Sequence, residues 1–223
     1  MPDRPTLPAQ YCSPNSAQWA YAQWVYDSYA LGKVLGTSVT NGGGDTWFFI
    51  TVDYTFGHAL ERDTSQFVKA AGGKVLGSVR APINTSDFSS FLLQAQASGA
   101  KVIAFTNTGN DTVNAVKQGR EFGMSPGGAQ QFVAMNAFFS DVAGMGLADG
   151  QGVMLTEPFY WDQDDQTRAW SKRFEERMGR KPTAIQAGAY SEVSHYLKAV
   201  KAAGSKDADK VMARCGKSRS TTS

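Results

Sequence analysis

The sequence has little net charge, few cysteines and few histidines. Its 223 residues carry 22 Lys and Arg against 20 Asp and Glu, which gives a formal net charge of +2. No bulk electrostatic field therefore points to nucleic acid or to an acidic membrane surface. The two cysteines, Cys12 and Cys215, stand near opposite ends of the chain. Neither belongs to a CxxC motif or has a histidine beside it in sequence. This argues against a zinc site, and the spacing leaves open whether the two cysteines pair.

Long apolar runs are also missing. No stretch approaches the ~20 apolar residues that a membrane-spanning helix needs, so we expect no membrane insertion. The first eight residues, Met1–Pro8, contain no apolar signal core. On this pattern the chain is expected to be cytosolic or truncated.

The motifs of common catalytic sites are missing as well. Gly42–Gly44 precedes an apolar run and lacks the GxxxxGK[ST] spacing, so it predicts a flexible turn and not a phosphate-binding loop. The two histidines, His58 and His195, have no nucleophile elbow near them. The sequence therefore predicts neither an enzyme nor a bound cofactor.

What the chain does contain is a steady alternation of apolar runs and helical patterns. The clearest example is Trp47–Gly57, where an apolar run breaks into a polar, aromatic turn that ends in glycine. Strands are predicted over 47–52, 74–80, 101–105, 132–135 and 152–156, and helices over 57–71, 88–98, 111–122 and from 138. Strands that alternate with helices through short turns form right-handed βαβ units. The predicted fold class is therefore α/β, with a doubly wound parallel sheet.

The regions that flank this alternation differ from it. Residues 1–17 are expected to be extended, and a helix over 18–35 opens a ligand-binding lobe that runs to residue 157. Helical patterns at 164–178 and 184–203, with no strand between them, assign residues 158–204 to an incomplete second lobe. Residues 205–223 are low in apolar side chains and are predicted to be disordered.

An acidic cluster stands at the start of the helix predicted over 164–178. It consists of Asp162, Asp164 and Asp165. A calcium loop needs alternating oxygen ligands, a glycine and a distal glutamate, which this short run does not provide. Carboxylates at a helix N-terminus interact favourably with the helix dipole, so the pattern favours capping over a metal site.

Polar and aromatic residues follow three of the predicted strands and form the candidate binding site. The three loops are Asp53–Phe56, Thr106–Asp111 and Asn136–Phe138. Parallel strands end at one edge of a sheet, and ligands bind in the crevice outside that edge. Neutral hydrogen-bonding groups and aromatic rings suit an uncharged or monoanionic organic ligand, and helix N-termini beneath them favour a carboxylate. Generic polar loops are the alternative interpretation. The predicted ligand-binding residues in these loops are Asp53, Tyr54, Phe56, Asn107, Thr108, Asn136 and Phe138.

Four segments in a fixed order carry a likeness to a known family. They are Asp53–Gly57, Phe88–Ile103, Lys117–Met124 and Gly152–Asp162. Together they resemble the leucine/isoleucine/valine-type periplasmic substrate-binding proteins of ABC importers, over roughly residues 11–203. The resemblance implies a fold of two doubly wound lobes that close on a ligand. It also implies that this chain holds mainly the second lobe, with a remnant of the first.

The resemblance also implies roles for individual residues. It places the aromatic residue that closes over ligand at Phe56 and a ligand-facing position near Thr108. It adds Tyr160, on the return across the hinge, to the candidate residues. The acidic residue that binds the ammonium of an amino acid falls at Asn136 here. Because a charged hydrogen bond is worth about 1.5–3 kcal/mol, a neutral amide predicts a ligand without an α-ammonium, such as an aromatic or other small carboxylate or an amide.

The expected function is the substrate-binding component of an ABC importer, here as a fragment. It is expected to bind a small organic ligand between two lobes: an aromatic or other small carboxylate, an amide or an amino acid. The permease is the expected partner of the full-length parent, and the periplasm is the expected location. With one lobe incomplete, this chain alone is expected to bind ligand weakly or not at all and to associate. One alternative is a cytosolic ligand-sensing regulator with the same fold. A less favoured one is an enzyme on a flavodoxin-like sheet.

Overall fold

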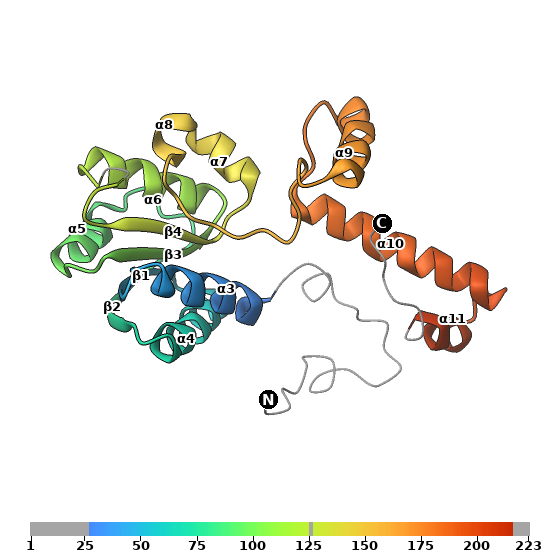
Figure 1. Cartoon of the computed structure of the whole chain (residues 1–223), viewed down its shortest axis with the longest axis horizontal. Helices are drawn as coiled ribbons and strands as arrows, with labels where there is room; N and C mark the ends of the chain where they lie inside the picture. Colours follow the sequence, from blue (N-terminus) through green and yellow to red (C-terminus); the bar gives the residue numbers. More distant parts are fainter. Residues whose placement is uncertain (1–26, 125–126, 216–223) are drawn as a thin grey trace. The chain divides into compact units, whose positions relative to one another are not determined.

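The computed structural model describes residues 27–124 and 127–215 (Figure 1). The chain divides into two compact units, and the boundary lies between Glu157 and Pro158. The first unit is Asp27–Glu157, and the second contains the described residues from Pro158 onward. The segment predicted to be extended, residues 1–17, and Cys12 lie outside the described residues.

The first unit is built on a four-stranded parallel sheet. Its strands are β1 (Thr46–Val52), β2 (Lys74–Ala81), β3 (Val102–Thr108) and β4 (Gln131–Asn136), in the order β2-β1-β3-β4. β1, β3 and β4 are almost entirely buried, as expected for parallel strands covered on both faces. The predicted α/β class with a parallel sheet is confirmed.

Two pairs of helices cover the two faces of the sheet (Figure 1). One face carries α3 (Ser28–Asn41) and α4 (Thr55–Ala70), and the other carries α5 (Ser89–Ala97) and α6 (Asn110–Glu121). The short helices α7 (Phe139–Met145) and α8 (Leu147–Gly150) contact α6. The core under α5 and α6 is made of large apolar side chains that are almost fully buried. These are Phe48, Ile50, Phe88, Leu92, Ile103, Phe105, Val116 and Phe132.

The junction between β1 and α4 requires glycine at position 57. A Cβ atom at Gly57 would lie 2.3 Å from the carbonyl oxygen of Val52, well inside any real contact distance. The absence of a side chain therefore lets the first turn of α4 approach the end of β1. This close approach fixes the position of the loop Asp53–Phe56 at the edge of the sheet.

The predicted C-terminal end of the helix over 18–35 is wrong. Residues 18–26 lie outside the described part of the chain, and α3 continues six residues beyond Leu35 to Asn41. Leu31, Leu35 and Val39 are all buried, so the apolar stripe runs on for one more turn. Gly42 then caps the helix, as expected from the glycine run.

The predicted fifth strand over 152–156 is not formed. Met154 makes one isolated parallel bridge to Val133, through hydrogen bonds with the backbones of Phe132 and Ala134. The residues on either side are a turn and irregular chain, so a repeating ladder does not develop. The apolar run that suggested a strand instead places half-buried Val153 against the core.

The second unit is helical. It contains α9 (Asp165–Met178), α10 (Ala184–Ala203) and α11 (Ala208–Cys215). The predicted cap is confirmed, because Asp164 Oδ1 accepts a hydrogen bond of 2.8 Å from the Thr167 amide. The prediction of disorder from residue 205 is wrong for 208–215. Val211 and Cys215 are buried beside Ala199, and this apolar face orders α11.

Candidate functional site

The ends of β1, β3 and β4 meet at one edge of the sheet. All pairs are parallel, and the last residues of β3 and β4, Thr108 and Asn136, are register partners. The loop that follows β1 begins at Asp53, whose amide donates to Ala81 at the end of β2. The structure thus brings the three predicted loops to the same edge of the sheet.

The loop after β1 presents two aromatic rings and a paired carboxylate. Tyr54 and Phe56 stack with their ring centroids 6.1 Å apart. Asp53 Oδ1 lies 2.8 Å from His58 Nε2, and both side chains are about half exposed. Asp53 is therefore held by a neighbour on α4, and the rings remain on the surface of the loop.

The loop predicted over 106–110 is wrong in its first half. β3 continues to Thr108, and both Thr106 and Asn107 are fully buried inside the strand. The ladder with β4 breaks after Phe105 and resumes at Thr108. Between these positions, Thr106 Oγ1 accepts a 3.3 Å hydrogen bond from the Val52 amide. Polar side chains are accommodated here because the strand ends at the edge where other polar groups collect. Gly109, with φ of 54°, then turns the chain into α6.

Several buried polar atoms at this edge have no hydrogen-bond partner in the structure. They are both amide atoms of Asn107, Oγ1 of Thr112 and Oδ1 of Asn136. An unsatisfied buried group costs about 1–3 kcal/mol, so such groups indicate a place where water or a ligand supplies the partner. Thr112, in the first turn of α6, was not predicted. The signal in the sequence was a hydroxyl immediately after the candidate loop Thr106–Asp111.

The segment after β4 is held by two carboxylates. The Phe138 amide donates to Asp141 Oδ2, and the Phe139 amide donates to Glu157 Oε1, both at 2.8 Å. Burial raises the pKa of Glu157 to about 7, assisted by the negative charge of Asp141, while the bond from Phe139 lowers it. Burial also raises the pKa of Asp141. Glu157 was not predicted either, and its only signal was an acid in an otherwise apolar segment.

Tyr160 is the one predicted ligand-binding residue outside the unit Asp27–Glu157. Tyr160 belongs to the second unit, where its ring lies 5.6 Å from that of Trp161. Its side chain is 45% exposed. Its role at a ligand site therefore remains a prediction from the family likeness alone.

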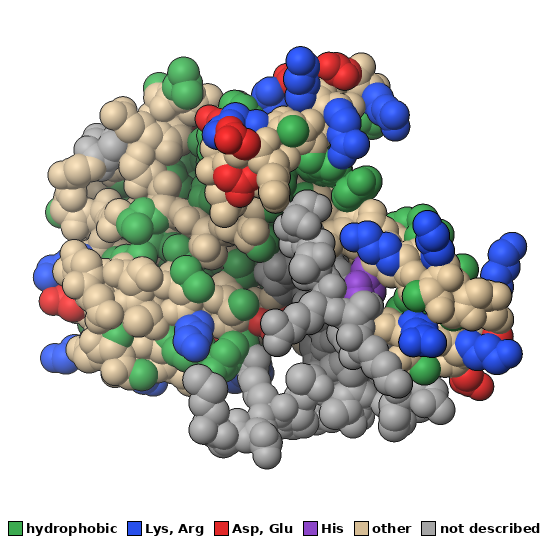
Figure 2. Space-filling model, turned by 45° about the vertical axis from the view of Figure 1, so that its right-hand side comes forward, with side chains coloured by type: hydrophobic (Ala, Val, Ile, Leu, Met, Phe, Trp, Pro, Cys, Tyr) green, Lys and Arg blue, Asp and Glu red, His purple; other side chains and the backbone are tan. Residues whose placement is uncertain are grey.

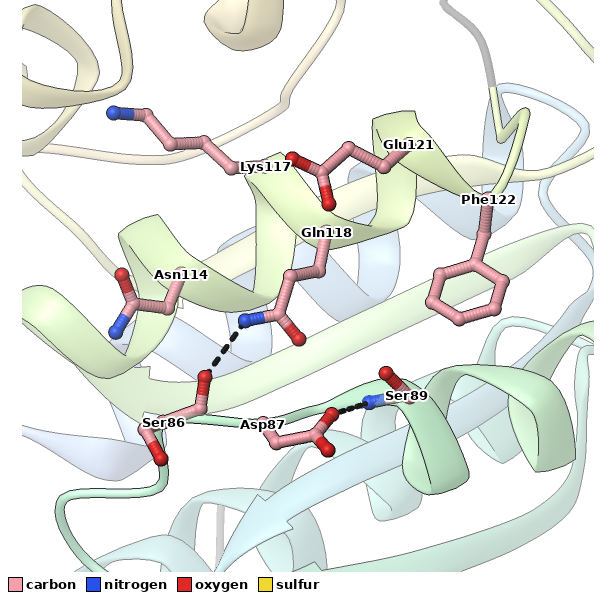
Figure 3. Close-up of a pocket in the computed structure, with 8 residues that line it drawn as sticks. All are labelled: Ser86, Asp87, Ser89, Asn114, Lys117, Gln118, Glu121 and Phe122. Carbon is pink, nitrogen blue, oxygen red and sulfur yellow. Dashed lines mark hydrogen bonds between the residues drawn. The ribbon is translucent and has the colours of Figure 1, made fainter.

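A shallow groove of about 450 Å³ lies between the start of α5 and the outer face of α6 (Figure 3). Gln118 ties its two sides together, donating from Nε2 to the Ser86 carbonyl at 2.8 Å and accepting from the Phe88 amide at 2.7 Å. Asp87 caps α5 through the Ser89 amide. These polar groups already have partners within the fold. None of the predicted ligand-binding residues lines this groove.

Figure 2 shows Lys and Arg interspersed with Asp and Glu on the visible face of the described residues. Within the described ranges, no group of three or more potential metal-ligating side chains comes together. No helix in that part of the chain has the length and apolar content to cross a membrane.

The fold and the sequence together define a family. Residues 5–219 match the family model of periplasmic binding proteins, so the chain belongs to this family. A sequence comparison with curated proteins finds no match.

Solved structures give more specific likenesses. A periplasmic binding protein from Burkholderia mallei is 50% identical, with a TM-score of 0.80, over 85% of this chain and 50% of that one. A branched-chain amino acid ABC transporter periplasmic ligand-binding protein from Burkholderia xenovorans LB400 is 42% identical, with a TM-score of 0.77, over 86% and 51%. A solute-binding protein from R. palustris in complex with benzoate is 14% identical, with a TM-score of 0.76, over 86% and 53%, which shows the fold alone. This chain spans about half the length of the structures it matches.

Proposed function

We propose that this chain provides one ligand-binding lobe of an ABC-importer binding protein, and that its ligand is a small organic molecule without an α-ammonium. The observation that carries the proposal is the set of unpartnered, buried, neutral polar atoms on Asn107, Thr112 and Asn136. They lie on neighbouring elements at the carboxyl edge of the sheet, where open α/β sheets bind ligands.

The charges at this edge support a ligand without an ammonium. Of the acids near the strand ends, Asp53 lies against His58, and Asp111 accepts a 2.9 Å hydrogen bond from the Asn84 amide. The carboxylates of Asp141 and Glu157 accept hydrogen bonds from the amides of Phe138 and Phe139. Asn136 supplies a neutral amide at the end of β4. An ammonium placed there would lack the charged partner that makes its hydrogen bonds strong.

The aromatic rings and helix ends support a planar carboxylate or amide. Tyr54 and Phe56 offer stacked faces beside the edge, and offset stacking with a ligand ring suits this arrangement. α4 and α6 both begin at the same edge, and the amides at helix N-termini favour an anion. Two fold relatives from Rhodopseudomonas palustris carry benzoate and 3,4-dihydroxybenzoic acid, and the Burkholderia xenovorans relative is named for branched-chain amino acids.

The proposed mechanism involves binding and no chemical conversion. A ligand that contacts two lobes shifts the equilibrium towards a closed form, which the permease recognises in the periplasm. In this proposal the unit Asp27–Glu157 belongs to one lobe, and residues 158–204 belong to the other. Because a one-lobed site leaves the ligand half solvated, this chain alone binds weakly and tends to associate.

A titration of two probes tests the ligand class. Benzoate and leucine are titrated into the ¹⁵N-labelled chain, and dissociation constants are taken from the amide shifts. We expect saturable benzoate binding, and leucine binding at least tenfold weaker. Asn136→Asp restores a carboxylate of the same size and reverses this order. Tighter binding of leucine than of benzoate by the unmodified chain contradicts the proposal.

A further inference from the structure

The segment Met154–Glu157 holds the residues on both sides of the loop after β4. Met154 exchanges two backbone hydrogen bonds with β4, donating to Phe132 at 2.9 Å and accepting from Ala134 at 2.8 Å. Three residues later, Glu157 accepts a hydrogen bond from the Phe139 amide at the start of α7. The candidate ligand segment Asn136–Phe138 lies between these two attachments.

Two carboxylates accept hydrogen bonds from consecutive backbone amides at the start of α7. Asp141 binds the Phe138 amide from within the helix, and Glu157 binds the Phe139 amide from a segment 18 residues away in sequence. The first amides of a helix have no partner inside it, so these contacts set how the chain enters α7. Asp141 is a local cap. Glu157, by contrast, is the last residue before the boundary between the two units, and its side chain links that position to the start of α7.

We propose that Glu157 is a positioning residue, which fixes Asn136 and Phe138 at the binding edge by holding the Phe139 amide. The inference rests on the proposed binding function of that edge. In this role Glu157 acts through the α7 backbone, because its side chain accepts a hydrogen bond from the Phe139 amide.

Because Glu157 gains its negative charge as the pH rises, measurements at different pH values can test this role. The charged side chain that acts on it is Asp141 of α7, whose negative charge favours the protonated form. Burial acts in the same direction and is the larger cause, so the pKa of Glu157 lies at about 7. An ionised carboxylate accepts an amide hydrogen bond more strongly than a neutral acid does. The attachment of Phe139 therefore tightens as the pH rises through this value.

Amide shifts of the ligand-free chain between pH 5.5 and 8.5 provide the first test. The Phe139 amide proton should move downfield with a midpoint near pH 7, and the amides of Asn136 and Phe138 should follow the same midpoint. Glu157→Gln keeps an acceptor but cannot ionise, so it should abolish this titration at all three amides. Glu176→Gln, at an exposed glutamate on α9, is the matched control and should leave it unchanged.

Hydrogen exchange distinguishes the loss of the hydrogen-bond acceptor at position 157 from the loss of its negative charge. Glu157→Ala removes the acceptor and should speed exchange of the Phe139 amide by about tenfold, as expected for one lost hydrogen bond. Glu157→Gln should restore most of the protection. Titration or faster exchange at Phe139 with no response at Asn136 and Phe138 overturns the proposal, because Glu157 would then be only a local cap. Absence of any response at Phe139 overturns it as well.

A ligand titration completes the test. If benzoate binds, its affinity should differ at least threefold between pH 6 and pH 8 in the unmodified chain and stay constant in Glu157→Gln. Equal pH dependence in both proteins contradicts the positioning role. If benzoate binds no variant, the proposed ligand class fails, while the amide titrations still decide the role of Glu157.

Discussion

The two units of the chain differ in how they bury apolar surface. Among the residues that the structure describes, the largest fully buried side chains all lie in the unit Asp27–Glu157 and include Trp47, Phe105 and Phe132. In the helical unit, the buried apolar residues are small, such as Ala184, Ala199 and Val211. Its longest helix, α10, exposes half or more of the side chains of Val193 and Leu197.

This difference shows which unit carries its own core. A parallel sheet covered on both faces buries its strands completely, whereas helices need a partner layer to bury an apolar stripe. Tyr190, Val193 and Leu197 stand at the i, i+3 and i+7 positions of such a stripe on α10. The matched structures are about twice as long as this chain, so they contain chain that has no counterpart here. We expect the first unit to be the stable one.

The largest effect is expected from a truncation in the core of the first unit. Phe105 is fully buried and meets Phe132 edge to face, with ring centroids 5.2 Å apart. Phe105→Ala should lower the free energy of unfolding by about 3–5 kcal/mol. The control is Leu197→Ala on α10, where the side chain is 58% exposed and a change within about 0.5 kcal/mol is expected. Urea unfolding followed by circular dichroism measures both, and equal losses would remove the distinction between the units.

A second effect is expected at the junction of β1 and α4. Gly57→Ala forces a Cβ atom against the Val52 carbonyl and should destabilise the first unit by roughly 1–3 kcal/mol. Gly144, in α7, has its nearest neighbour at 4.0 Å, the limit of van der Waals contact. Gly144→Ala should therefore be neutral or stabilise by up to about 1 kcal/mol. Thermal unfolding of the two variants distinguishes them, and a tolerated Gly57→Ala would show that the junction is loosely packed.

A third effect depends on pH. The pKa of Glu157 in the folded chain, about 7, lies above its ordinary value of 4.5, so the folded state favours the protonated acid. Its contribution to stability is complete below about pH 4.5 and is lost as the pH rises through about 7. Because Glu157 is only half-buried, we expect Glu157→Gln to stabilise the chain by about 1–2 kcal/mol at pH 8. At pH 4.5 the variant should match the unmodified chain. Urea unfolding at the two pH values checks this, and a gain that is equal at both would contradict the raised pKa.

The smallest effect is expected in the helical unit. Val211 of α11 is 2% exposed, and Val211→Ala should cost about 1 kcal/mol. Val193 of α10 is 56% exposed, so Val193→Ala should change the free energy of unfolding by less than about 0.5 kcal/mol. Hydrogen exchange of the α11 amides detects the first change locally. A loss at Val211 as large as that at Phe105 would show that the helical unit has a full core after all.

The sequence predicted the sheet well and its edge less well. Trp47–Ile50 and Val102–Phe105 are continuous apolar runs, which is the pattern of strands buried on both faces. The polar side chains of Thr106 and Asn107 predict a loop, although both residues are buried in β3. Thr106 Oγ1 accepts a hydrogen bond from the Val52 amide of β1, 54 positions away, and such a contact leaves no local pattern in the sequence. Glu157 was missed for the same reason, since its partner is the Phe139 amide.

Local sequence patterns gave two further wrong predictions, one of a strand and one of disorder. The apolar run around Met154 suggested a strand, yet it makes a single bridge because the neighbouring residues do not pair. The tail around Val211 looked too polar to fold, yet two apolar residues one turn apart suffice to order α11 against α10. Thr112 and the buried amide of Asn107 could be recognised as unpartnered only once the surrounding fold was known.

Mapping benzoate binding on the whole chain tests most directly the claim that the carboxyl edge of the sheet is the ligand site. The measurement is the change in every assigned backbone and side-chain amide resonance when benzoate is added to the ¹⁵N-labelled chain. The largest changes should occur at Asn107, Thr112 and Asn136, including the side-chain amides of the two asparagines. Changes confined to α9–α11, or to the groove beside Gln118, would contradict the assignment of the binding site.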